Sequence, residues 1–157
     1  MIGSMSVCDL YDDDFYLWTQ AQAEALRAEA RRRGGSNELD WEHLAEEVAD
    51  LGKSDLRECL SRTRTIIEHL LKLSAGTRDD PRAGWLVTVK TQRADLKLVL
   101  SKSLRAKLAL ALPELHEEAL DIVLTAFAAE EPSVQIDKSL SWSLPAILGE
   151  TDDPIGE

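Results

Sequence analysis

The sequence predicts an all-α protein: a helical bundle with one long central helix, about five helices in all, and an extended C-terminal arm. Two observations predict this class. The composition favours helices, with 44% hydrophobic and 30% charged residues and only 8 Gly and 5 Pro in 157 residues. Apolar residues also recur every three or four positions along most of the chain. The length suits one domain, which we expect over residues 9–148, followed by an acidic tail over residues 149–157.

The first predicted helix is FYLWTQAQAEALRAEARRR, residues 15–33. Asp12–Asp14 come before it, arginines occupy its last turn, and Gly34 and Gly35 follow it. Acid at the start and base at the end complement the helix dipole, and glycine often ends a helix. We therefore interpret Asp12–Asp14 as an N-cap and dipole cluster rather than a metal site.

The second predicted helix is the longest and runs from near Asp40 to about Ser74, a length of about 50 Å. Its apolar or small positions alternate in steps of three and four, with one extra step of four at Gly52, as in a coiled-coil seam with a stutter. These positions are Trp41, Ala45, Val48, Gly52, Leu56, Cys59, Thr63, Ile66, Leu70 and Leu73. Gly52 disfavours a helix interior by about 1 kcal/mol relative to Ala, so it indicates a close helix crossing or a bend. Cys59 is expected to be a small buried hydrophobe.

In the rest of the chain, prolines and a serine indicate where further helices begin. Pro81 suits the first turn of a third helix, Ser103 could cap a short helix through Leu110, and Pro113 would begin a fifth. The segment after Pro132, SVQIDKSLSWSLPAILG, has no visible partner strand. We interpret it as an extended arm packed on the bundle that ends in a short turn of helix from Pro145, with a frayed acidic tail beyond it.

Charge and missing motifs exclude several classes of function. A net charge of −11 opposes binding to phosphate backbones, so no nucleic-acid partner is expected. No apolar run approaches the roughly 20 residues of a membrane span, and no secretory signal pattern is visible, so we expect a cytoplasmic protein without a membrane partner. No phosphate-binding loop, dinucleotide fingerprint, nucleophile elbow or zinc motif occurs, so no cofactor is expected.

The stretch LDWEHLAEEVADLG, residues 39–52, holds five carboxylates and a histidine. On a helical wheel one arc contains Trp41, Leu44, Ala45, Val48 and Leu51. The opposite side contains Glu42, His43, Glu46, Glu47 and Asp50. Carboxylates of a metal site in a helical bundle must project inward, so these acids are expected to form a solvated or partner-facing surface.

A magnesium site is the alternative interpretation of the acids. Glu47 and Asp50 share their spacing with Glu118 and Asp121, and all-α nucleotide pyrophosphatases use such pairs on facing helices to hold Mg²⁺. However, Glu118 and Asp121 lie opposite the apolar stripe of their own predicted helix. The spacing is also frequent by chance in acidic helices, so we favour solvated faces for both pairs.

The three histidines do not form a ligand set in the sequence. His43 and His116 are expected at the surface. His69 lies at the border of an apolar face, where a half-buried, hydrogen-bonded histidine is commoner than a catalytic one.

Two glutamines, Gln22 and Gln92, interrupt the apolar faces of the first and third predicted helices. A buried amide without a partner costs about 1–3 kcal/mol, so each should bond the other, a backbone group or a buried water. The other interpretation is a small-ligand pocket. Its lining would be Trp18, Gln22, His69, Trp85, Gln92 and Arg93.

Four stretches together carry a resemblance to a known family: YDDDFYLWTQAQAEALR, LDWEHLAEEVADLGKS, HLLK at residues 69–72, and W-x-x-T-x-x-x-QR at residues 85–93. In this order and at about these distances they resemble the bacterial domain-of-unknown-function family twenty-nine of cyanobacteria and proteobacteria, over roughly residues 9–148. That family usually has Asn in place of His43 and Ser in place of Gly84. The resemblance implies a cytoplasmic, mostly helical bacterial protein and brings no activity, catalytic residue or cofactor.

The leading functional hypothesis is a small non-enzymatic helical protein that binds another protein and also itself, as a homo-oligomer. The seam-like long helix, the acidic surface and the lack of a catalytic constellation support it. The alternatives are a magnesium-dependent nucleotide hydrolase-like enzyme and a small-ligand binder at Gln22 and Gln92.

Overall fold

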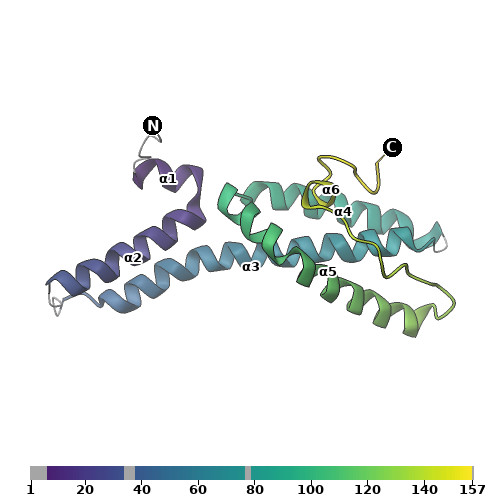
Figure 1. Cartoon of the computed structure of the whole chain (residues 1–157), viewed down its shortest axis with the longest axis horizontal. Coiled ribbons are helices and arrows are strands. Elements are labelled where there is room, and N and C mark those ends of the chain that lie inside the picture. Colours follow the sequence, from purple (N-terminus) through teal and green to yellow (C-terminus); the bar gives the residue numbers. More distant parts are fainter. Residues whose placement is uncertain (1–6, 34–37, 77–78, 157) are drawn as a thin grey trace. The chain divides into compact units, whose positions relative to one another are not determined.

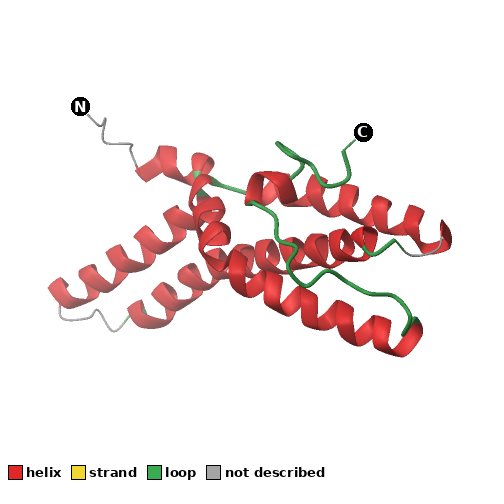
Figure 2. Cartoon of the chain, turned by 45° about the vertical axis from the view of Figure 1, so that its right-hand side comes forward, coloured by secondary structure: helices red, strands yellow, loops and turns green. Residues whose placement is uncertain are grey.

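The computed structural model describes residues 7–33, 38–76 and 79–156. These contain six helices: α1 (Val7–Asp13), α2 (Phe15–Arg33), α3 (Trp41–Ser74), α4 (Asp79–Val99), α5 (Lys102–Glu130) and α6 (Leu144–Ile147), shown in Figure 1. No strand occurs in these three ranges, as the colouring of Figure 2 shows. The predicted all-α class with one long helix is confirmed, and the predicted bounds of α3 are met within a residue or two.

The chain divides into two compact units. The N-terminal unit comprises the described residues up to Glu58 together with Ser101–Ala106, and the C-terminal unit comprises Cys59–Leu100 together with the residues from Lys107 onward. The division falls inside α3 and inside α5, so both helices contribute to both units.

In the N-terminal unit, α2 and the first part of α3 lie side by side and antiparallel (Figure 1). Small side chains form their contact: Ala23, Ala45 and Ala49 are almost completely buried. Gln20 of α2 donates its Nε2 hydrogen to the carbonyl oxygen of Ala49 on α3, with a separation of 3.2 Å. A side chain this short reaches a helix backbone only where the two helices approach closely.

Gly52 faces α2 within this contact. A Cβ added there would be 2.1 Å from the Thr19 hydroxyl oxygen and 3.1 Å from the Gln20 amide nitrogen, which leaves no room for even a methyl group. Gly52 is also buried. Of the two interpretations of this glycine, the structure supports the close helix crossing.

Asp14 connects the starts of two helices in the N-terminal unit. Its carboxylate accepts the backbone N–H of Leu17 at 3.1 Å, which caps α2 as predicted. It also accepts the backbone N–H and the hydroxyl of Ser103 at 2.8 and 2.6 Å, at the start of α5. Burial opposes the charged form, but the hydrogen bonds from Ser103 and Leu17 outweigh it and hold the pKa of Asp14 below its usual value.

The cap prediction was wrong for the two other aspartates. Asp12 and Asp13 end α1, a short helix that the periodicity did not predict, instead of beginning α2. A helix of 7 residues has too few turns for an apolar period to stand out.

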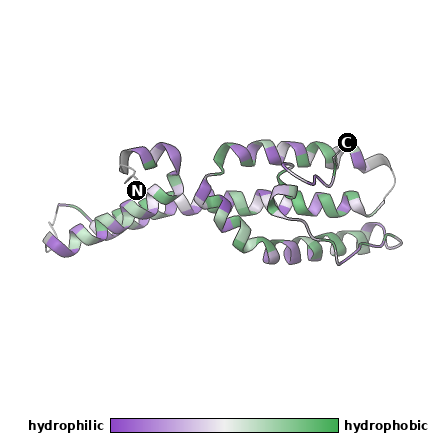
Figure 3. Cartoon of the chain, turned by 45° about the horizontal axis from the view of Figure 1, so that its top comes forward, coloured by the Kyte–Doolittle hydropathy of each residue, from purple (hydrophilic) through white to green (hydrophobic). Residues whose placement is uncertain are grey.

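In the C-terminal unit the second part of α3 packs with α4 and α5 through large aliphatic side chains. Residues that are at most 1% exposed include Ile66, Ile67, Leu70, Leu71, Val89, Leu96, Leu108 and Val123. Cys59 is fully buried, as predicted. Figure 3 shows the alternation of hydrophobic and hydrophilic residues around these helices.

The predicted break between a short fourth helix and a fifth helix at Pro113 was wrong, because α5 is continuous from Lys102 to Glu130 with Pro113 inside it. Proline removes one backbone hydrogen bond, to the carbonyl four residues earlier. That carbonyl belongs to Ala109, and Ala109 and Pro113 are both exposed, so water can satisfy it. The flanking alanines, leucines and glutamates are strong helix formers, which lets the helix continue.

The segment after Glu131 has no regular structure until Ser143, whose side chain accepts the N–H of Ala146 and caps α6. Pro145 occupies the first turn of α6, as predicted. Ile136, Leu144, Ile147 and Leu148 are buried. The predicted arm is therefore packed within the C-terminal unit and ends in a short helix.

Replacement of Gly52 by Ala should lower the free energy of unfolding by about 1–3 kcal/mol, because the added methyl group has no space beside Thr19. Urea denaturation followed by circular dichroism measures this change. Thr19→Ala removes the nearest oxygen and should recover part of the loss in the double variant.

Gly84 provides the matched control for this test. It lies inside α4, with no heavy atom within 4 Å of its ideal Cβ, so Gly84→Ala should stabilise the protein by about 0.5–1 kcal/mol. Equal effects of the two glycine substitutions would contradict the close crossing at Gly52.

Candidate functional site

The most distinctive surface of the N-terminal unit is a row of exposed apolar side chains on α3. Leu44, Val48 and Leu51 are spaced by four and three residues, so they share one side of the helix; we call them the apolar stripe. Leu44 is 41% and Leu51 55% exposed, and Val48 is half-buried. Their size would suit a core, but they are left at the surface.

The close crossing explains this exposure. Each stripe residue directly precedes one of the small residues that face α2, namely Ala45, Ala49 and Gly52, and neighbouring residues point about 100° apart on a helix. Because the small residues occupy the contact with α2, the large ones point away from it. Leu44 and Leu51, which share the apolar arc of the helical wheel with Ala45, are therefore exposed whereas Ala45 is buried.

Charged side chains border the apolar stripe. The five polar residues predicted on the opposite side of the wheel are all exposed, which confirms that part of the prediction: Glu42, His43, Glu46, Glu47 and Asp50. The last turns of α2 are basic. Arg27 pairs with Glu24 and Glu42, and Arg31 and Arg32 are exposed. The hairpin of α2 and α3 thus has an acidic helix beside a basic helix end.

A cavity of about 660 Å³ adds to the apolar surface of the same unit. Leu10, Leu17 and Ala106 supply its apolar wall, and Asp13, Asp14 and Lys102 contribute the charged side chains. Leu17 is 45% exposed. The N-terminal unit therefore leaves large aliphatic side chains uncovered at more than one place.

The six residues of the predicted pocket are divided between the units. Trp18 and Gln22 belong to the N-terminal unit, whereas His69, Trp85, Gln92 and Arg93 belong to the C-terminal unit. Neither unit by itself contains the whole set, so a pocket lined by all six stays a prediction.

Within the N-terminal unit, Trp18 belongs to an aromatic cluster at the junction of α1 and α2. Its ring meets that of Tyr11 edge-on at 4.8 Å and stacks on Phe15 at 5.7 Å. Gln22 is half-buried, and Gln20, which was not singled out in the sequence, makes the polar contact with α3.

Gln92 has a structural partner in the C-terminal unit. Its amide oxygen accepts a hydrogen bond from Arg62 of α3 at 3.0 Å, and the same nitrogen of Arg62 lies 2.9 Å from the Asp95 carboxylate. Gln92 therefore has an internal partner, as the structural interpretation expects, and the ligand-binding interpretation stays a prediction. The partner is an arginine, which was not among the expected ones.

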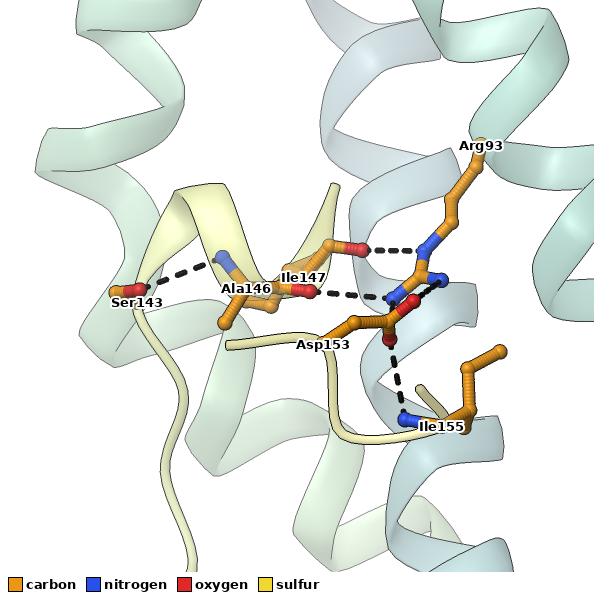
Figure 4. Close-up of polar contacts among 6 residues, drawn as sticks. All are labelled: Arg93, Ser143, Ala146, Ile147, Asp153 and Ile155. Carbon is orange, nitrogen blue, oxygen red and sulfur yellow. Dashed lines mark hydrogen bonds and ion pairs between the residues drawn. The ribbon is translucent and has the colours of Figure 1, made fainter. Parts of the chain in front are cut away.

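Arg93 holds the C-terminal segment of the chain (Figure 4). It is 7% exposed, and its Nε and one terminal nitrogen donate to the carbonyl oxygens of Ile147 and Ala146 at 2.7 and 3.1 Å. Both terminal nitrogens donate to the Asp153 carboxylate, at 2.9 and 3.0 Å. Asp153 in turn accepts the backbone N–H of Ile155 at 3.1 Å. All of these bonds are internal, so the guanidinium is committed to holding the chain together.

These contacts correct the expectation of a frayed tail, at least as far as Ile155. A positive φ of 71° at Gly149 directs the chain around the guanidinium, and a Cβ there would lie 2.9 Å from an Arg93 nitrogen. Glycine meets both conditions, since it tolerates this φ and leaves the space free.

Trp85 and His69 both contact other groups of the C-terminal unit. Trp85 meets Phe127 edge-on at 6.3 Å, with the Lys72 ammonium 6.0 Å from its ring. His69 is half-buried and its Nδ1 lies 2.8 Å from the Thr65 carbonyl oxygen, as predicted. Burial lowers the pKa of His69, an effect that the hydrogen bond to Thr65 only partly offsets.

His116 was wrongly expected at the surface. It is half-buried against the arm, with Nε2 3.2 Å from the Trp142 carbonyl oxygen and its ring 5.9 Å from the Trp142 ring. Burial lowers its pKa. His43 is exposed as predicted, and its hydrogen bond with Asp40 raises its pKa.

The acidic pairs of the magnesium hypothesis also fall in different units, Glu47 and Asp50 in one and Glu118 and Asp121 in the other. Asp50 pairs with Lys53 at 2.8 Å and Glu118 with Arg64 at 3.2 Å. Within the described ranges, no three His, Cys, Asp or Glu side chains are grouped so that they could hold a metal ion. No helix in these ranges has the length and apolarity needed to cross a membrane.

Asn in place of Asp153 should lower the free energy of unfolding by about 1–3 kcal/mol at neutral pH, because a buried guanidinium loses its anionic partner. Burial raises the pKa of Asp153, but the hydrogen bonds from Arg93 and Ile155 and the nearby positive charges outweigh it, so the pKa lies below the usual 3.8.

The contribution of Asp153 is therefore complete above pH 3.8 and disappears as the pH falls through the lower pKa of the folded state. Urea denaturation across this range should show the difference between wild type and Asp153→Asn shrinking toward zero in acid. Asp152→Asn, at an exposed neighbouring position, is the control and should match wild type throughout. A difference that persists below the folded pKa would contradict this account.

The family model described as "Domain of unknown function DUF29" matches residues 10–151. The match spans most of the chain, so the chain belongs to this family, and the resemblance seen in its motifs is confirmed. The crystal structure of an alpha-helical protein of unknown function from Rhodospirillum rubrum is similar, with 28% sequence identity, 92% of each chain covered and a TM-score of 0.77. Comparison with curated proteins finds no match.

Proposed function

We propose that this chain, as a member of the family Domain of unknown function DUF29, is a non-enzymatic helical protein that acts by binding protein, and first of all a second copy of itself. The binding surface is the apolar stripe of the N-terminal unit. One observation carries the proposal: α2 and α3 pack through alanine and glycine, which leaves Leu44 and Leu51 exposed.

Exposed leucines in a row differ from single exposed leucines, which are normal on protein surfaces. A helix hairpin covers only one side of each helix, so the side of α3 that carries the apolar stripe, about 100° from the contact with α2, is available for a second hairpin. Two such hairpins form a four-helix arrangement in which the leucines of both copies are covered. Removing a leucine side chain from water contributes about 1.5–3 kcal/mol when burial is complete.

The charges around the stripe favour a second copy as the occupant. A two-fold symmetric contact uses the same surface on both molecules, so that surface must complement itself. The acidic side of α3, which includes Glu46 and Asp50, would repel an identical helix placed directly against it. The exposed arginines at the end of α2, Arg31 and Arg32, offer the opposite charge on the same hairpin, and Arg32 also pairs with Glu29 of its own helix. A contact that places α3 of each copy beside α2 of the other removes the repulsion.

Light scattering over a range of concentrations tests self-association of the full chain. We expect a dimer that dissociates on dilution and weakens at high salt, because exposed charges are screened. Leu44→Glu and Leu51→Glu should each shift the protein to monomer while its helix content, measured by circular dichroism, stays unchanged.

Leu98 and Leu110 are matched controls, since they are exposed leucines of the C-terminal unit at 85% and 81%. Leu98→Glu and Leu110→Glu should leave the dimer intact. A wild-type protein that stays monomeric up to about 1 mM would overturn self-association, because even a contact of about 4 kcal/mol is detectable there. A dimer that resists both stripe substitutions would overturn the assignment of the surface.

A further inference from the structure

The C-terminal unit contains a cavity of about 240 Å³ that neither the apolar stripe nor the predicted pocket includes. It lies among the end of α3, the start of α4, the arm and the last residues of the chain. Its lining consists of Leu70, Leu73, Ser74, Arg82, Leu140, Trp142, Pro154 and Ile155. Six of these eight side chains are apolar.

Arg82 is the charged member of this lining. One of its terminal nitrogens donates to the carbonyl oxygen of Leu73 at 3.0 Å, which fixes the guanidinium at the end of α3. A guanidinium has five N–H groups, and the bond to Leu73 uses one of them. Among the side chains of residues 38–76 and 81–156, no carboxylate forms an ion pair with Arg82. The Ser74 hydroxyl, in contrast, is occupied by the carbonyl oxygen of Leu71 at 2.7 Å.

Internal contacts hold the part of the cavity wall that the arm and the last residues form. Figure 4 shows the Asp153 carboxylate bonded both to Arg93 and to the backbone N–H of Ile155, which positions Pro154 and Ile155. His116 contacts the backbone of Trp142 and so positions the arm. The wall thus rests on buried or half-buried groups of the helices, and the cavity is part of the folded unit.

We propose that this cavity binds a small apolar monocarboxylate, with the carboxylate on Arg82 and the hydrocarbon part among Leu70, Leu140 and Trp142. A guanidinium matches a carboxylate through two parallel hydrogen bonds. A phosphate would bring more charge than one arginine offsets, and the apolar walls would leave its other oxygens without donors. A dry cavity of about 150 Å³ binds benzene. In proportion, the cavity of about 240 Å³ has room for a ligand of roughly ten non-hydrogen atoms.

Binding of hexanoate by the full-length protein tests the proposal, with hexanamide as a neutral probe of the same size. Two-dimensional NMR of nitrogen-15-labelled protein follows the indole N–H of Trp142, assigned by Trp142→Phe. We expect saturable shifts of this signal with hexanoate and at least about tenfold weaker binding of hexanamide.

Two variants separate the charge from the shape of the cavity. Arg82→Gln should weaken hexanoate binding at least about tenfold, and the exposed position of Arg82 makes loss of the fold unexpected. Asp153→Asn, which releases the wall, should weaken both probes. Arg64→Gln, which removes an arginine paired with Glu68 and Glu118, is the control and should bind hexanoate as wild type does.

Three results would overturn the proposal. The first is the absence of a saturable shift up to about 50 mM hexanoate, a concentration far above a millimolar dissociation constant. The others are binding of hexanamide as tight as that of hexanoate, and an affinity of Arg82→Gln for hexanoate equal to that of wild type. None of them bears on self-association, because the apolar stripe belongs to the other unit and Leu44→Glu should leave hexanoate binding unchanged.

Discussion

The close approach of α2 to α3 at Gly52 is the constraint on which the N-terminal unit depends. Helix backbones come this near only where side chains are small, and here alanine, glycine and threonine line the contact. Such a contact buries little apolar area, so the hairpin gains less from it than the C-terminal unit gains from its aliphatic core. The same geometry turns Leu44 and Leu51 toward the surface. One constraint therefore explains both the thin core of this unit and the surface through which we propose that it binds protein.

The last residues of the C-terminal unit depend in a similar way on one side chain, that of Arg93. A buried guanidinium is stabilising only when its N–H groups have acceptors, and here two carbonyl oxygens and one carboxylate supply them. All three acceptors lie in the last residues of the chain. A segment with little regular structure is thus held by directional bonds to one side chain on α4. These bonds also support one wall of the cavity in which we place a carboxylate ligand.

The acidic character of the chain is distributed rather than concentrated. Several of the acids that suggested a metal site have individual basic partners, such as Asp50 with Lys53 and Glu118 with Arg64. Such surface pairs contribute little to stability, typically 0–1 kcal/mol. In the proposed dimer, their effect would lie in the field that they present to the second copy.

The sequence by itself determined the helical class, the bounds of α3 and a cap among Asp12–Asp14, and it narrowed Gly52 to a close crossing or a bend. These features depend on local spacing and on the chemistry of single residues, which a helical wheel represents well. The sequence also determined that the acids near Glu46 lie at the surface, since they are on the side of the helical wheel opposite the apolar residues. A wheel shows which residues share a side of a helix, but not which side another helix covers.

Only the tertiary structure decided the rest. Leu44 and Leu51 share the apolar arc with Ala45 but are exposed, because α2 covers one part of that arc and no described element covers the other. His116 is covered by an arm from 26 residues further along the chain, and Arg93 meets Asp153 across 60 residues. Gln92 is bonded by Arg62 of another helix. Contacts over such separations leave no period in the sequence, because they arise from where the backbone places distant side chains and not from the local repeat of the helix.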